Sequence, residues 1–320
     1  MKAKTRAIVL LSGGLDSILA VRALQEQGIE VVGISFESPF FKADKARTAA
    51  EQLGIELKVV KLKKDYIAMV KNPKHGHGSA INPCIDCHAF MLRKAKGMMK
   101  KLKADFIATG EVLNERPMSQ NLESLKIVEE ESGLKGKLLR PLSAKCLGET
   151  EAEKKGLVDR NKLLDIKGRT RNRQMELAAK WNLSYPTPGG GCLLCETEIE
   201  KKLLDLFKHN ETDDISLDLI KTGRHFRAHG QIIVGRNKEE NDKLEKVGKT
   251  WIKMECKDVL GPITLFRDEK DVKKAAELTA FHGRTEGKKT KVIFWNRSKK
   301  DTKEIEVEVP SRESVEEIRI

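Results

Sequence analysis

The chain has 320 residues, of which 61 are Lys or Arg and 48 are Asp or Glu, giving a formal net charge of +13. This length excludes a small disulfide-stapled module and suits two domains that each bury a core. No apolar run reaches the ~18 residues that cross a bilayer, and no secretory leader is recognisable, so we expect a cytoplasmic protein with no membrane partner. The basic excess favours a polyanionic partner such as nucleic acid, although Lys/Glu-rich surfaces also serve solubility.

Short β-branched runs alternate with helical patterns over the first hundred residues. The pattern predicts strands over 7–11, 31–36 and 57–61, helices over 17–27 and 45–53, then a helix over 87–103 and a strand over 106–109. This alternation predicts a parallel sheet with right-handed crossovers.

A polar, helical stretch over 122–184 follows and ends in a loop over 185–191, which holds two prolines and three glycines. After a helix over 198–209, short strands return over 231–235, 263–266 and 291–295. We therefore expect an α/β domain over 1–207 and a smaller α+β domain over 208–320.

A glycine-rich hexapeptide stands where the first strand passes into the first helix: Ser12, Gly13, Gly14, Leu15, Asp16 and Ser17. Glycines let the backbone approach a phosphate, helix amides point at an anion, and a carboxylate can hold a bridging cation. An ordinary strand-to-helix turn is the alternative, and the Lys of a kinase-type phosphate loop is missing.

The hexapeptide resembles the PP-loop of the ATP pyrophosphatases, which adenylate a carbonyl or carboxyl oxygen and release pyrophosphate. The resemblance implies an adenine nucleotide alpha hydrolase-like, Rossmann-like domain that binds ATP and Mg²⁺. It also implies a catalytic role for Asp16 and an adenine pocket near Phe36 and Gly110.

Four of the six cysteines form two CxxC pairs, Cys84 with Cys87 and Cys192 with Cys195. The first pair precedes the helix expected over 87–103, whose N-terminus would stabilise thiolates. From spacing alone, a structural zinc site, a catalytic site and a dithiol redox pair all remain open.

The segment 82–88, Asn-Pro-Cys-Ile-Asp-Cys-His, resembles the NPCxxC motif of tRNA uridine thiolases. Segments 109–120, 140–145, 168–171 and 190–194 resemble the same group, including the ATPase domain of 4-thiouridine synthetases. The resemblance implies a [4Fe-4S] cluster on Cys84, Cys87 and Cys192, with Cys84 and Cys192 catalytic. Cys195 departs from the family pattern, and the sulfur donor, sulfide or a cysteine desulfurase, stays open.

Residues 222–227 and 231–237 predict a β-hairpin with a charged turn. The same segment resembles the RNA-binding domain of NFACT proteins, which implies that Arg224, Arg227 and Arg236 contact RNA. A second basic region, residues 58–103, holds twelve basic and two acidic residues around the first CxxC pair. We expect Lys94, Lys96 and Lys100 there to contact the tRNA backbone.

Together these features predict an ATP-dependent tRNA uridine sulfurtransferase that adenylates a uridine carbonyl oxygen and replaces AMP by sulfur from a cluster or a cysteine persulfide. One alternative is a PP-loop amidotransferase or small-molecule thiolase with a structural zinc ion. Another is a non-catalytic RNA-binding protein that senses ATP. The sequence leaves a homodimer open.

Overall fold

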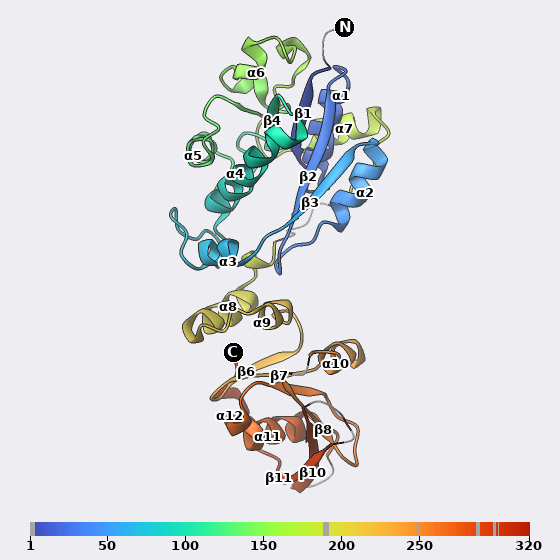
Figure 1. Cartoon of the computed structure of the whole chain (residues 1–320), viewed down its shortest axis with the longest axis vertical. Coiled ribbons are helices and arrows are strands. Elements are labelled where there is room, and N and C mark those ends of the chain that lie inside the picture. The colour runs from blue at the N-terminus through green and yellow to red at the C-terminus, as the bar shows by residue number, and fades with distance from the viewer. Residues whose placement is uncertain (1–3, 188–191, 249, 286–288, 297–298, 300) are drawn as a thin grey trace. The chain divides into compact units, whose positions relative to one another are not determined.

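The computed structural model describes residues 4–187, 192–248, 250–285, 289–296, 299 and 301–320, and each of its two units has its own sheet (Figure 1). The units comprise residues 1–197 and 198–320. The boundary expected after residue 207 lies inside helix α8 (Thr197–His209). No helix in the described part of the chain is long and apolar enough to cross a membrane.

The sheet of the first unit is parallel throughout, as the alternating pattern predicts. Its strand order is β3-β2-β1-β4-β5. The central strands are buried on both faces, which explains their continuous apolar sequences. The strands are β1 (Arg6–Leu10), β2 (Glu30–Glu37), β3 (Glu56–Lys61), β4 (Phe106–Thr109) and β5 (Leu138–Leu139).

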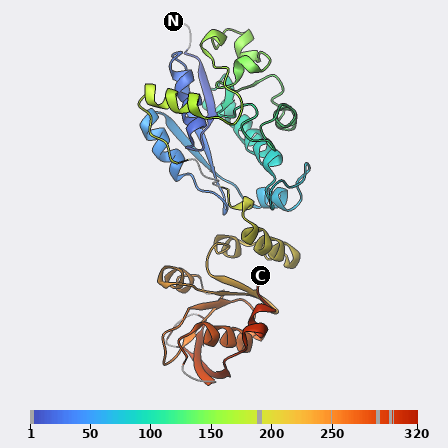
Figure 2. The same ribbon diagram turned by 180° about the vertical axis from the view of Figure 1, so that it is seen from behind.

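Helices cover both faces of this sheet because the strand order reverses between β1 and β4. Helix α1 connects β1 to β2, and α2 connects β2 to β3, so these two helices lie on the same face of the sheet. Helix α4 precedes β4, on the other side of β1, and lies on the opposite face (Figures 1 and 2). The helices are α1 (Leu15–Gln25), α2 (Asp44–Leu53), α3 (Lys64–Lys71), α4 (Cys84–Leu102), α5 (Leu122–Ser132), α6 (Glu151–Lys154) and α7 (Asn172–Lys180).

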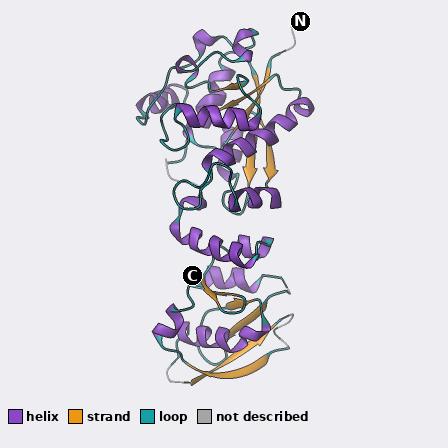
Figure 3. Ribbon diagram, turned by 90° about the vertical axis from the view of Figure 1, so that its left-hand side faces the viewer, coloured by secondary structure: helices purple, strands orange, loops and turns teal. Residues whose placement is uncertain are grey.

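The second unit is built on an antiparallel sheet (Figure 3). Its strand order is β11-β10-β8-β9-β7-β6. Its strands are β6 (Arg224–Arg227), β7 (Gln231–Val234), β8 (Ile252–Cys256), β9 (Thr264–Phe266), β10 (Lys289–Trp295) and β11 (Lys303–Glu308). Strands β6 and β7 form the expected hairpin. The α/β fold with a second, smaller α+β part is thereby confirmed.

Alternate residues of β7 enter two different cores of the second unit. Ile232 and Val234 pack on the α11 side, whereas Ile233 packs with Leu244 and Trp251 on the other side. The period of two is that of a strand buried on both faces. The remaining helices are α9 (Asp214–Asp218), α10 (Lys238–Glu245), α11 (Val272–His282) and α12 (Arg312–Glu316).

Candidate active site

The glycine loop joins β1 to α1 at the carboxyl edge of the parallel sheet. Gly13 has φ +77°, and a Cβ there would lie 2.3 Å from the backbone carbonyl of Lys45, so both the torsion angle and the packing require glycine. The Ser12 hydroxyl accepts from the Gly14 amide at 3.3 Å and lies 3.2 Å from the Ser17 hydroxyl. These contacts fix a loop that leads directly into the N-terminus of α1, where backbone amides can face a phosphate.

The loop lies at the point where the strand order reverses, which is where open parallel sheets bind ligands. Gly110 follows the neighbouring strand β4 and touches the loop backbone: a Cβ there would lie 2.5 Å from the Ser17 amide nitrogen. Leu15 and Phe36, also expected at the nucleotide site, are 4% and 5% exposed. Their side chains therefore belong mainly to the core beneath this edge.

Asp16 is a partly buried carboxylate in the first turn of α1. Burial and the nearby Glu115 raise its pKa from 3.8 to about 6, against the opposing effect of Arg171. Arg171 contacts Asp16 Oδ2 at 3.3 Å and also donates to Glu115. Among the described residues, the buried Oδ1 atom of Asp16 has no hydrogen-bond partner. This free carboxylate oxygen fits a ligand for Mg²⁺, which prefers oxygen donors.

The two CxxC segments come together in the structure. Cys84 and Cys87 lie in the first turn of α4, which begins three residues earlier than the sequence indicates. The Asn82 side chain links this turn to the second segment: its Oδ1 accepts from the Cys84 thiol at 3.0 Å, and its Nδ2 donates to Cys195 Sγ at 2.6 Å. Cys192 interacts electrostatically with both Cys84 and Cys195. Gly190 and Gly191 of the second motif lie outside the described residues.

Burial keeps three of these sulfurs as thiols. It raises the pKa of Cys84, which Cys195 reinforces, and it raises the pKa of Cys87 to about 12 and of Cys192 to about 11. Burial therefore opposes the ionisation that the α4 N-terminus was expected to favour. Tyr66 adds a contact of 3.3 Å between its hydroxyl and Cys87 Sγ.

The thiols do not fit an iron–sulfur cluster or a zinc ion as they stand. Within the described ranges, no group of three or more His, Cys, Asp or Glu side chains is arranged to hold one metal ion. The four sulfurs are neighbours, yet the Asn82 amide lies between Cys84 and Cys195 rather than a shared centre. We therefore derive no chemical step through a bound metal at this position.

A buried polar network connects the thiol segment to the nucleotide edge. His88, in the next turn of α4, places Nδ1 2.8 Å from Glu111, and Glu111 directly follows Gly110. The same carboxylate accepts from Thr109 at 2.9 Å and from Arg140 at 3.0 Å. Burial alone would raise the pKa of Glu111, but Arg140 and His88 hold it below its ordinary value. The sequence motifs contain these residues but do not reveal that they meet.

The expected RNA-binding residues differ in how their charge is balanced. Lys94 pairs with Asp65 at 2.6 Å, Lys96 donates to the Gly133 carbonyl at 2.8 Å, and Lys100 is exposed on α4. Lys94 is paired with a carboxylate, whereas Lys96 keeps its net charge because its partner is a neutral carbonyl. A phosphate would have to compete with the Asp65 carboxylate for Lys94.

In the second unit, Arg227 pairs with Asp205 and with Glu211, and Arg236 donates to Glu240 at 2.9 Å. Arg224 donates only to the Gly235 carbonyl, at 3.3 Å, among the contacts of the described residues. The three arginines of the motif are therefore not equivalent.

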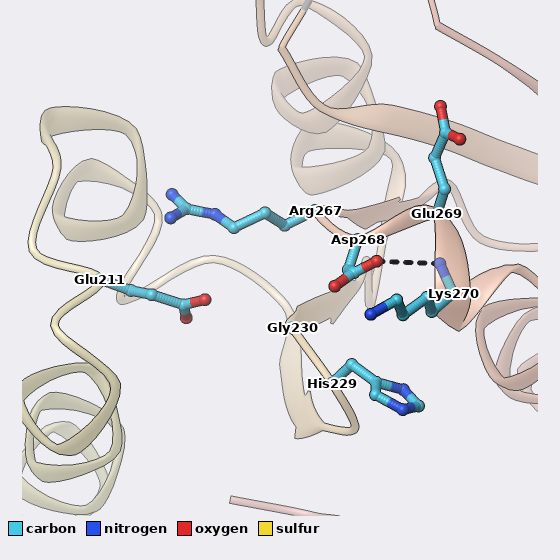
Figure 4. A pocket seen from close by; sticks show the side chains of 7 residues that line it. All are labelled: Glu211, His229, Gly230, Arg267, Asp268, Glu269 and Lys270. Atoms are coloured by element: carbon cyan, nitrogen blue, oxygen red, sulfur yellow. Dashed lines mark hydrogen bonds between the residues drawn. The ribbon is translucent and has the colours of Figure 1, made fainter.

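A pocket of about 500 Å³ opens on the same unit, and its lining carries both signs of charge (Figure 4). Arg267 and Lys270 lie among three carboxylates of the lining. Arg267 also pairs with Asp213 and lies over the ring of Trp251. Such mixed lining does not select an anion. The lining residues are Glu211, His229, Gly230, Arg267, Asp268, Glu269 and Lys270.

Comparison with known proteins identifies both parts of the chain. Residues 5–132 match the tRNA methyl transferase HUP domain, and residues 223–319 match the NFACT protein RNA binding domain. The chain joins a PP-loop HUP domain to an NFACT-type RNA-binding domain. Both resemblances drawn from the sequence motifs are thereby confirmed.

The PP-loop domain is also similar to curated proteins. It is 33% identical over 135 residues to the tRNA-specific 2-thiouridylase MnmA of Geobacter metallireducens, covering 34% of this chain and 36% of that protein. It is 35% identical over 113 residues to the tRNA-specific 2-thiouridylase MnmA 3 of Bacteroides fragilis, covering 34% and 31%. The chain thus spans about a third of the length of the curated relatives it matches.

Two solved structures show a weaker likeness. One is a predicted subunit of tRNA methyltransferase from Methanocaldococcus jannaschii, with 16% identity, a TM-score of 0.37, and coverage of 55% of this chain and 76% of that one. The other is a 4-thiouridine synthetase–RNA complex with bound ATP, with 18% identity, a TM-score of 0.37, and coverage of 68% and 53%.

Proposed function

We propose that this protein is an ATP-dependent tRNA uridine sulfurtransferase. The observation that carries the proposal is a continuous line of contacts at one sheet edge. The glycine loop touches Gly110, Glu111 follows it, and Glu111 binds His88 beside Cys87. An anion-binding loop and a group of four thiols therefore share one edge, as adenylation followed by sulfur transfer requires. Similarity to tRNA thiouridylases supports the choice of tRNA uridine as substrate.

In the proposed reaction, the ATP phosphates lie on the amides of the loop over 12–17. A uridine carbonyl oxygen attacks the α-phosphorus, and the bond to pyrophosphate breaks. Fixed amides stabilise the charge that develops on the transferred group. Mg²⁺ held by Asp16 would supply further neutralisation of the phosphates.

Sulfur then displaces AMP, which leaves with the former uridine oxygen. We place the sulfur nucleophile on the cysteine group as a persulfide, formed when a cysteine desulfurase passes the terminal sulfur of its own cysteine persulfide to a thiol of this group. The terminal sulfur attacks the adenylated carbon as AMP leaves. A second thiol of the group then attacks the inner sulfur, which releases thiouridine and leaves a disulfide that an external dithiol reduces. Cys84 and Cys192 are the proposed carriers, although their raised pKa values mean that loading or substrate binding must favour the ionised form. A [4Fe-4S] cluster on Cys84, Cys87 and Cys192 would require these side chains to rearrange round one centre.

The experiment uses purified chain, tRNA lacking thiouridine, ATP, a cysteine desulfurase with cysteine, and dithiothreitol, with thiouridine measured by mass spectrometry of tRNA nucleosides. We expect thiouridine only when ATP is present, and none from Cys84→Ser. Cys146→Ser is the matched control, because Cys146 lies in the same unit and its thiol donates to the Asp165 carbonyl, away from the other cysteines. ATP-dependent amidation or thiolation of a small molecule, with tRNA unchanged, would refute the proposal. RNA binding without pyrophosphate release would also refute it.

A further inference from the structure

The chain end extends the sheet of the second unit at its β6 edge. Arg319 forms an antiparallel bridge with Phe226, the Arg227 amide donates to the Ile318 carbonyl at 2.8 Å, and the Ile320 amide donates to the His225 carbonyl at 3.0 Å. Residues opposed across such a bridge project to the same side, and so do residues two apart on one strand. Arg224 and Arg319 therefore project from the same face of this edge.

His282 contributes a third nitrogen donor to this face. It is the last residue of α11, and its ring centroid lies 5.9 Å from that of Phe226. Its Nε2 atom is buried and has no hydrogen-bond partner among the described residues. Burial, Arg224 and Arg319 together lower the pKa of His282 to about 4, so the ring is neutral at neutral pH.

The positive charge at this edge is only partly balanced. Arg319 pairs with Glu316 at 3.0 Å, but no carboxylate of the described chain lies within ion-pair distance of Arg224. Burial, with Arg319 and Arg236 nearby, lowers the pKa of the Arg224 guanidinium. Like charges held together and an unsatisfied ring nitrogen both cost free energy, which a bound anion would recover.

Gly223 immediately precedes Arg224, and its backbone conformation sets where the Arg224 side chain begins. It has φ +75°, and a Cβ would lie 2.6 Å from the Val234 carbonyl oxygen. Only glycine allows so close an approach at that torsion angle. Arg227, on the opposite face of β6, is held by Asp205 and Glu211 instead.

We propose that Arg224, Arg319 and His282 bind one phosphate of a single-stranded RNA segment at the β6 edge. The planar guanidinium forks suit phosphate oxygens, and a neutral imidazole donates one further hydrogen bond. This inference rests on the RNA binding included in the proposed function. It assigns a structural role to Arg227 and Arg236, whose carboxylate partners already neutralise them.

The test measures binding of a fluorescent single-stranded RNA to the full chain by anisotropy over a series of salt concentrations. Arg224→Gln should weaken binding and reduce the slope of log K against log salt by about 0.7, the value for one phosphate contact on a single strand. His282→Ala should weaken binding without changing the slope, because a neutral ring displaces no counterion. Lys303→Gln is the matched control, since it removes one exposed charge from β11 at the opposite edge of the same sheet.

The outcomes separate this inference from the proposed function. Absence of RNA binding by the unmodified chain would refute the RNA-binding part of the proposed function itself. If the unmodified chain binds RNA and Arg224→Gln behaves like Lys303→Gln, the phosphate site is wrong. Should Arg224→Gln fail to fold, Arg319→Gln applies the same criterion, because that side chain is 47% exposed and its loss should leave the fold intact.

Discussion

Replacing Asp16 by Asn should stabilise the ligand-free chain while abolishing its activity. The folded state raises the pKa of Asp16 from 3.8 to about 6. A carboxyl group with a raised pKa favours folding in its protonated form, so its ionisation destabilises the fold as pH rises through this window. A shift of about two units corresponds to about 3 kcal/mol at neutral pH. Asn keeps the shape and carries no charge, so the variant should gain up to that amount.

The assay is urea denaturation of both proteins at neutral pH and again near pH 4, with ATP affinity measured by calorimetry. The stability difference should be largest at neutral pH and nearly vanish at the lower pH, where Asp16 is protonated in the folded state. Affinity for Mg²⁺–ATP should fall for the variant. An Asn variant that is less stable at neutral pH, or a stability difference that does not depend on pH, would refute this view of Asp16.

Three further outcomes follow from the site. In Gly110→Ala, the new Cβ would lie 2.5 Å from the Ser17 amide nitrogen, so the loop must move by nearly 1 Å. This displacement should reduce turnover about 10²-fold in a kinetic assay. Gly97→Ala, which adds a methyl group in open space on α4, should leave turnover unchanged. Glu111→Gln removes one of the two carboxylates paired with the buried Arg140, Glu129 being the other. The free energy of unfolding in urea should therefore fall, by less than the about 3–5 kcal/mol of a fully broken buried pair, whereas an unchanged midpoint would contradict the network. Brief alkylation followed by mass spectrometry should label exposed Cys195 before buried Cys87, and the reverse order would show that the thiols are arranged differently.

Much of the first unit is predictable because its signals are local. Continuous apolar strands, the glycine loop and helix periodicity all lie within short windows, and β4 (Phe106–Thr109) agrees with its expected bounds. The start of α4 was harder to locate, because Pro83 and two cysteines interrupt the apolar pattern just where the helix begins. Strands β8 and β11 were not predicted, although Ile252–Cys256 and Lys303–Glu308 both alternate apolar and polar residues with the period of a strand. Both strands pair with β10 in the sheet.

The electrostatics of the site depend on contacts that no local pattern contains. His88, Glu111 and Arg140 are far apart in sequence, and only the fold brings them into one network. The same holds for Arg227, whose partner Asp205 lies on α8. Burial raises the pKa of Cys84, and Cys195 from the second CxxC segment raises it further, a contact that the spacing of the first pair does not reveal.

The fate of the uridine oxygen tests the central claim most directly. The chain would be given ATP, a cysteine desulfurase with cysteine, dithiothreitol and tRNA whose target uridine carbonyl carries a heavy oxygen isotope, and the AMP and tRNA nucleosides would be analysed by mass spectrometry. If one sheet edge both adenylates the uridine and delivers sulfur, each AMP should carry one heavy oxygen, and AMP and thiouridine should form in equal amounts. Thiouridine formed with unlabelled AMP, or labelled AMP without thiouridine, would contradict the account.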